Sequence, residues 1–129
     1  MTLRMARIGL AAALWMSLPL PVLADEIFDA CLNDTAPQDT RCGEEWIARE
    51  KARLDTAWEH LTEVADENLA RELVAEQRAW ESFRDLSCTF KLDEGFGGAS
   101  GPNGFHACRA GIIAERATAI EGYVSYIDN

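Results

Sequence analysis

Apolar residues recur every three, four and seven positions along most of the chain, which is the spacing of one face of an α-helix. The pattern predicts a short helix over 25–33, a long helix from 40 to about 65, a third from 69 to about 92 and a last one from near 106. Asp66-Glu67-Asn68 is the only break between the two long helices, and it predicts a tight turn between antiparallel neighbours. No segment alternates as a strand does. The chain is expected to be all-α, a small disulfide-stapled helical bundle with three main helices plus a short N-terminal helix.

Two of the predicted helices carry polar residues on the stripe that should face inward. The expected inward residues of the third helix are Leu69, Leu73, Gln77, Trp80, Phe83, Arg84 and Cys88. Those of the last helix are Cys108, Ile112, Arg116, Ile120, Tyr123 and Ile127.

A desolvated guanidinium must be paired, and its five donors can tie several helices together. We therefore expect a structural polar cluster that fixes the helix register, formed by Asp55, Gln77, Arg84 and Arg116, with Asp85 as the alternative to Asp55. An anion-binding pocket is the functional alternative for the same residues.

The stretch 93–105 has five glycines and a proline and cannot be helical throughout. It lacks the lysine and the preceding strand of a phosphate-binding P-loop. A surface loop is therefore predicted, and it is the candidate partner-binding segment because the helical faces are committed to packing. The residues that it would offer are Asp93, Glu94, Phe96, Ser100 and Asn103. The alternative is a plain connector, with attraction to a partner coming from a diffuse acidic surface.

The N-terminus has the features of a secretory signal peptide over 1–24. Two arginines precede an apolar run over 8–20, and small residues lead to a cleavage site after Ala24. Cleavage would leave one small domain over 25–129. The apolar run is short for a membrane span, and the next residue is Asp25 rather than a lipid-accepting cysteine. No membrane anchor is expected after cleavage, and a retained anchor helix is the alternative.

All four cysteines lie in the part of the chain that would be exported, so two disulfides are expected in an oxidising, periplasmic or secreted location. Four cysteines allow three pairings. The local pairs Cys31 with Cys42 and Cys88 with Cys108 are favoured because each closes a short loop, contributing on the order of 3 kcal/mol. Neither histidine stands at a metal-ligand spacing from a cysteine pair, so no metal and no cofactor is expected.

The chain after cleavage would hold 10 basic and 22 acidic residues, a net charge of −12. This balance argues against nucleic acid or anionic lipid as a partner and favours a basic protein. The simpler alternative is a solvated surface that serves solubility. The carboxylates are scattered beside basic neighbours, and no serine has a histidine that the sequence places near it. No catalytic site is therefore indicated, and the protein is not expected to be an enzyme.

A series of motifs in the chain resembles the LprI-type lysozyme inhibitor domain, over about 31–120. The residues that carry the resemblance are Cys42, Leu54-Asp55 with Trp58, Gln77-Arg78-Ala79-Trp80, Phe83-Arg84-Asp85, Cys88, Gly97-Gly98, Cys108 and Arg116. The segment from Gln77 to Cys88 is the most specific part. The chain has Asp55 where the family commonly has Asn, and Trp58 where it commonly has Tyr.

The resemblance implies an exported protein that binds a lysozyme and protects peptidoglycan, with no catalysis of its own. Such lysozymes are typically basic, which agrees with the acidic composition. The alternative is a periplasmic protein-interaction or scaffolding module with another partner.

Overall fold

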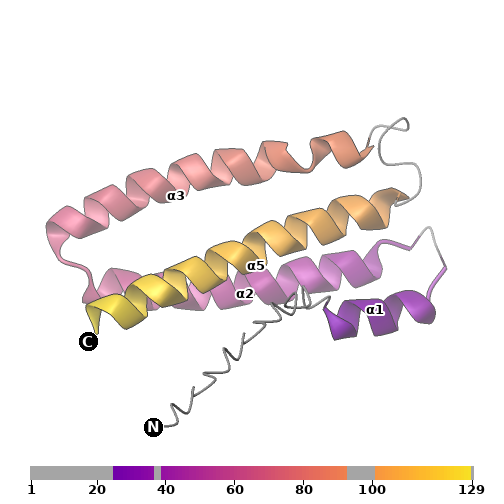
Figure 1. The fold of residues 1–129 in the computed structure, drawn as a ribbon, viewed down its shortest axis with the longest axis horizontal. Helices are drawn as coiled ribbons and strands as arrows, with labels where there is room; N and C mark the ends of the chain where they lie inside the picture. Colours follow the sequence, from indigo (N-terminus) through magenta and orange to yellow (C-terminus); the bar gives the residue numbers. More distant parts are fainter. Residues whose placement is uncertain (1–24, 37–38, 93–100, 129) are drawn as a thin grey trace, which may run out of the picture.

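The computed structural model describes residues 25–36, 39–92 and 101–128, and every regular element in them is helical (Figure 1). The elements are α1 (Glu26–Asn33), α2 (Arg41–Val64), α3 (Glu67–Ser87), the 3-10 helix η1 (Thr89–Leu92) and α5 (Gly101–Ile127). The expected all-α bundle is confirmed. None of these helices is long and apolar enough to cross a membrane.

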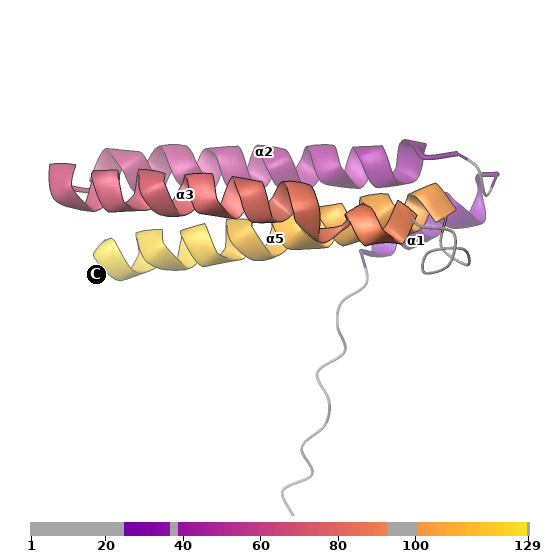
Figure 2. The ribbon, with the colours of Figure 1, turned by 90° about the horizontal axis from the view of Figure 1, so that it is seen from above.

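Helices α2 and α5 run in the same direction, and α3 runs antiparallel to both (Figure 1). Seen from above, α3 lies over the α2–α5 pair (Figure 2). Short α1 lies near the start of α2, away from α3. The chain therefore forms an up-down-up bundle with one extra helix at its N-terminal end.

The core is centred on the contact between α2 and α5. Its buried residues are Leu54, Ala57 and Leu61 of α2, Leu73 of α3, and Ile113, Ala117, Ile120 and Val124 of α5. Only Leu73 comes from α3, so α3 depends on partly buried side chains, among them Leu69 and Trp80, to pack against the pair.

Two expected inward positions are wrong. Phe83 is 57% exposed, because it lies roughly 80° around the helix from buried Leu73. Tyr123 is also exposed, because the buried stripe of α5 passes through Ile120 and Val124 instead. The periodicity predicted that both helices exist, but it made the buried face of each too wide.

Aspartates cap two of the helices at their starts. The Asp25 carboxylate accepts a 2.8 Å hydrogen bond from the Phe28 N–H and so caps α1. Asp66 accepts bonds from the N–H groups of Asn68 and Leu69, both at 2.9 Å, and caps α3. Because a side-chain oxygen satisfies these otherwise unpaired N–H groups, the chain can turn sharply at Asp66 without glycine or proline.

The last helix begins earlier than expected, at Gly101 rather than near His106. Proline is tolerated in the first turn of a helix, where its missing N–H has no intrahelical partner to lose. Pro102 therefore fits the first turn of α5, and Asn103 is a helical residue rather than part of a loop.

Both favoured disulfides, Cys31–Cys42 and Cys88–Cys108, are confirmed. The first ties α1 to the start of α2, where Arg49 also donates a 2.7 Å hydrogen bond to the Asp25 carboxylate. The second ties the end of α3 to α5. Each bridge thus fastens an element that contributes little to the buried core.

Gly43 is buried where α2 passes α5, and a Cβ at this position would overlap the Cβ of His106. We predict that Gly43→Ala lowers the free energy of unfolding by about 2 kcal/mol, because the two helix backbones would have to separate. Gly122→Ala is the matched control on α5, since its Cβ would meet nothing within 4 Å. Helix propensity alone should make this control more stable by up to about 1 kcal/mol. Denaturant melts of both variants decide, and equal stabilisation of the two would contradict the close approach.

Candidate functional site

Arg116 is a buried charge at the centre of the bundle, 7% exposed on α5. Its Nε donates a 3.0 Å hydrogen bond to the Gln77 side-chain oxygen, and its Nη1 donates a 2.6 Å bond to the Glu76 carboxylate. The Tyr123 hydroxyl donates to the same Glu76 oxygen at 3.2 Å. One guanidinium thus joins α5 to two successive residues of α3, which fixes the register of the two helices.

Trp80 lies between two cations. The guanidinium carbons of Arg84 and Arg116 are 5.3 Å and 5.7 Å from the centre of its ring. Both distances are within the range of cation–π attraction, which is stronger where water is excluded. The Trp80 ring therefore connects the buried Arg116 to the more exposed Arg84.

Arg84 pairs with a carboxylate of its own helix, Asp85, rather than with one from another helix. Its Nε donates a 3.0 Å hydrogen bond to Asp85, and Arg109 of α5 donates a 2.5 Å bond to the same oxygen. The bond from Arg84 lowers the pKa of the Asp85 carboxyl, and the charge of Arg109 acts in the same direction. Asp85 thus forms a second link between α3 and α5.

The structure brings together part of the expected polar cluster. Gln77 and Arg116 are hydrogen bonded, and Arg84 shares the Trp80 ring with Arg116. Asp55 is exposed and pairs with Lys51 at 2.6 Å. Asp55, Gln77 and Arg84 all line a cavity of about 270 Å³, and this shared cavity is what relates Asp55 to the other two.

Three members of this network were missing from the sequence prediction: Glu76, Arg109 and Tyr123 as a hydrogen-bond donor. A signal for two of them was present, since Arg109 and Tyr123 stand seven residues before and after Arg116 and so share its face of α5. Glu76 gave no such signal, because it lies at the exposed edge of α3.

This network holds α3 and α5 together. Each of its arginines donates to a carboxylate or an amide of α3. Within the described part of the chain, no group of three or more potential ligands could hold a metal ion.

Most of the predicted partner-binding residues cannot be placed. Asp93, Glu94, Phe96 and Ser100 lie outside the residues that the structure describes. Asn103 is half-buried in the first turn of α5.

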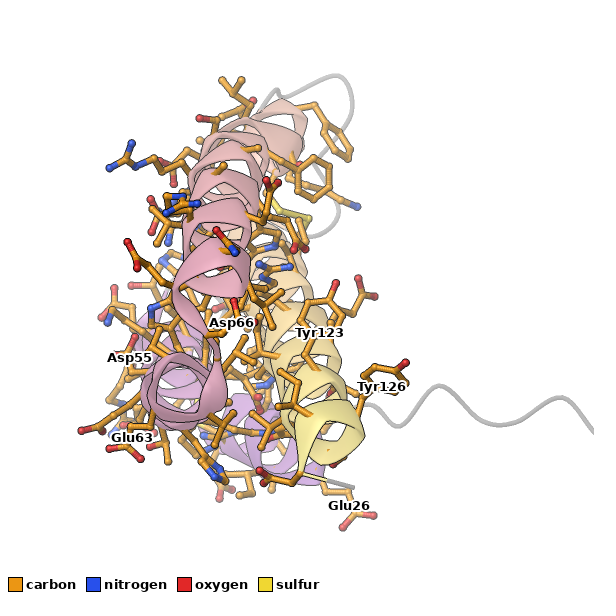
Figure 3. All side chains as sticks on the ribbon, turned by 90° about the vertical axis from the view of Figure 1, so that its left-hand side faces the viewer. Glu26, Asp55, Glu63, Asp66, Tyr123 and Tyr126 are labelled. Carbon is orange, nitrogen blue, oxygen red and sulfur yellow. A yellow bond between two sulfur atoms is a disulfide. The ribbon has the colours of Figure 1, made fainter. Side chains whose placement is uncertain are left out.

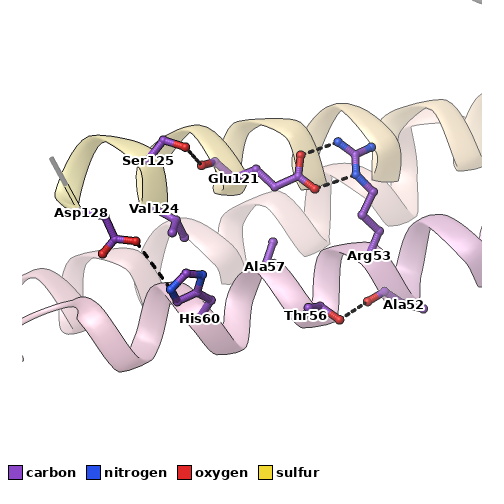
Figure 4. Close-up of a pocket in the computed structure, with 9 residues that line it drawn as sticks. All are labelled: Ala52, Arg53, Thr56, Ala57, His60, Glu121, Val124, Ser125 and Asp128. Carbon is purple, nitrogen blue, oxygen red and sulfur yellow. Dashed lines mark hydrogen bonds and ion pairs between the residues drawn. The ribbon is translucent and has the colours of Figure 1, made fainter.

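Two further hollows in the described surface lie beside α5. The α2–α5 groove has a volume of about 790 Å³ (Figure 4). Arg53 crosses it and donates to both oxygens of Glu121, at 2.7 Å and 2.5 Å. This hydrogen bonding lowers the pKa of the Glu121 carboxyl. His60 and Asp128 lie 3.6 Å apart at the far end. The charges in this groove are thus largely matched by one another.

The second groove, which we call the tyrosine groove, lies between α3 and α5 near the C-terminal end of α5. Its volume is about 440 Å³. The lining residues are Leu61, Leu69, Glu72, Leu73, Glu76, Tyr123, Tyr126 and Ile127. Both tyrosines project from one flank of α5, away from Asp55 and Glu63 of α2 (Figure 3). An apolar floor with acidic and aromatic edges is the kind of surface that proteins use to bind other proteins.

The sequence model of the protein family described as Lysozyme inhibitor LprI matches residues 31–120. The match begins at the first cysteine and includes both disulfides and the whole Arg116 network except Tyr123. No curated protein and no solved structure matches the chain.

Proposed function

Because the chain belongs to the lysozyme inhibitor LprI family, we propose that it is exported and binds a lysozyme, so that the enzyme no longer cleaves peptidoglycan. The protein itself supplies a binding surface and no catalytic group. The match over 31–120 is the observation that carries this proposal.

Export is supported by two features of the chain. The two disulfides are typical of proteins that fold outside the reducing cytosol. The first 24 residues have the composition of a signal peptide, with cleavage proposed after Ala24. These two features support our proposal that the mature protein lies in the periplasm or outside the cell.

The charge of the chain supports a basic partner. The full sequence has 22 acidic and 12 basic residues. An acidic protein attracts a basic enzyme over a distance of about a Debye length, roughly 8 Å at physiological salt, and this attraction speeds the encounter. Long-range attraction is not specific, so inhibition also requires a surface whose shape complements the enzyme.

The experiment that tests the proposal is a titration of the purified protein, residues 25–129, into a basic lysozyme acting on cell-wall substrate. We expect turnover to fall to near zero at about one inhibitor per enzyme. A scaffolding module would leave turnover unchanged, and a hydrolase would release product without any lysozyme. Either of these two results would overturn the proposed function.

A further inference from the structure

We propose that the tyrosine groove is the surface that docks the lysozyme, by receiving a lysine or arginine side chain from the basic face of the enzyme. The inference rests on the proposed function and adds to it the site of contact and the chemistry of the group that is bound. Four observations support it, and they concern the floor of the groove, its aromatic edge, its acidic edge and the charge around it.

The floor of the groove is apolar and firmly held. Leu61 is fully buried, and Leu73 is nearly so, which places this part of the groove directly on the bundle core. Leu69 and Ile127 pack against the same core. A rigid floor loses little conformational entropy when a partner binds, and it excludes water from beneath the inserted side chain.

The aromatic edge is exposed to an unusual degree. Tyr126 is 87% exposed, more than any other large hydrophobic residue in the described part of the chain. Tyr123 is also exposed, and its hydroxyl is fixed by the hydrogen bond to Glu76. Exposed tyrosines are enriched at protein interfaces, and their ring faces attract cations.

The acidic edge is formed by Glu72 and Glu76 of α3. Glu76 is anchored by Arg116, which sets the position of its carboxylate. Glu72 has no hydrogen-bond or ion-pair partner among the described residues, so its charge is available to a partner. A cation seated between these carboxylates and the tyrosine rings would be attracted by both.

The surrounding sequence is strongly acidic. From Glu59 to Glu76 there are six acidic residues and a single arginine. That arginine, Arg71, is engaged with Glu67 and Asn68. The stretch 121–128 adds two acids and no base. This end of the bundle therefore suits a basic occupant, and it disfavours a second copy of the same acidic chain.

The test uses two pairs of variants that keep the fold intact, because all four substituted residues are exposed. Glu72→Lys changes the groove, and Glu63→Lys makes the same change in net charge on a different flank, on α2 (Figure 3). Tyr126→Ala removes the aromatic edge, and Phe83→Ala removes an exposed ring on α3 that does not line the groove. Circular dichroism and thermal melts check that each variant is folded.

Calorimetric titration with a basic lysozyme gives the dissociation constant at two salt concentrations. We expect Glu72→Lys and Tyr126→Ala each to weaken binding at least tenfold, and Glu63→Lys and Phe83→Ala to weaken it less than threefold. Equal weakening by Glu72→Lys and Glu63→Lys would overturn the groove in favour of diffuse electrostatic attraction.

A fifth variant separates the groove from the segment that the sequence suggested. Replacing Phe96 and residues 100–103 by a Gly-Ser linker of equal length should leave the dissociation constant within threefold of wild type. Loss of binding in this variant alone would overturn the groove as the docking surface. A wild-type protein that binds no lysozyme would instead overturn the proposed function, and the groove proposal with it.

Discussion

Arg116→Ala is expected to lower the free energy of unfolding by about 3 kcal/mol, the largest effect of any charged residue in the described bundle. The substitution removes hydrogen bonds to Gln77 and Glu76 and the contact with the Trp80 ring. The loss of stability is limited, because the Glu76 side chain is 44% exposed and water can solvate the carboxylate that Arg116 no longer pairs. Arg116→Lys should recover little of the stability, since an ammonium cannot make both bonds in the same geometry.

Arg84→Ala is the matched control for this prediction. The Arg84 side chain is 26% exposed, and its partner Asp85 keeps a second arginine, Arg109. We therefore expect a cost of only about 1 kcal/mol, typical of a partly exposed ion pair. Denaturant melts of the three variants measure these differences. If the free energy of unfolding of Arg116→Ala lies within about 0.5 kcal/mol of wild type, as for a surface substitution, the contacts of Arg116 do not stabilise the bundle.

Removing the Cys88–Cys108 bridge by replacing both cysteines with alanine is expected to cost about 3 kcal/mol, the loop-closure value for 20 residues. The effect should be concentrated in α3. This helix contributes only Leu73 to the buried core cluster, so the bridge is one of its main attachments to α5. Amide hydrogen exchange should therefore accelerate in α3 while α2 and the second half of α5 stay protected.

The Cys31–Cys42 bridge provides the control, because its loop of 11 residues gives a similar entropic term. Its removal should expose the amides of α1 and leave α3 protected. Hydrogen exchange followed by mass spectrometry distinguishes the two patterns. Unchanged protection of α3 in the Cys88/Cys108 variant would mean that side-chain packing alone holds this helix.

Much of the fold could be predicted from the sequence, because the relevant signals are local. The helical periodicity, the break at Asp66-Glu67-Asn68 and the spacing of the cysteines each depend on neighbouring residues. The start of α5 could not be predicted in this way. Glycines at 101 and 104 read as a loop, and only the structure shows Pro102 in the first turn of a helix.

The polar site was predictable only in part. An arginine on an inward stripe signals that it needs a partner, and this was sufficient to single out Arg116 and Gln77. The identity of the carboxylate depends on the rotation of each helix about its own axis, which the periodicity gives only to within about one residue, or 100°. For that reason Asp55 was expected in the cluster, whereas Glu76 holds Arg116 and Asp55 pairs with Lys51.

The tyrosine groove could not be foreseen, since Tyr123 read as a core residue and Tyr126 had no assigned place. Its shape depends on how far the end of α5 extends beside the start of α3, a relation between residues more than 45 positions apart along the chain. The sequence directed attention to the glycine-rich stretch instead, because irregular segments so often carry binding residues.

The most direct test of the proposed function is light scattering coupled to size-exclusion chromatography on a mixture of the purified protein and a basic lysozyme. We expect a single species with the summed mass of one copy of each at low salt. Raising the salt concentration should shift it toward the separate proteins, because the partners carry opposite charges. Two separate masses at every salt concentration, with lysozyme turnover undiminished in the same mixtures, would contradict the claim that this protein is a lysozyme inhibitor.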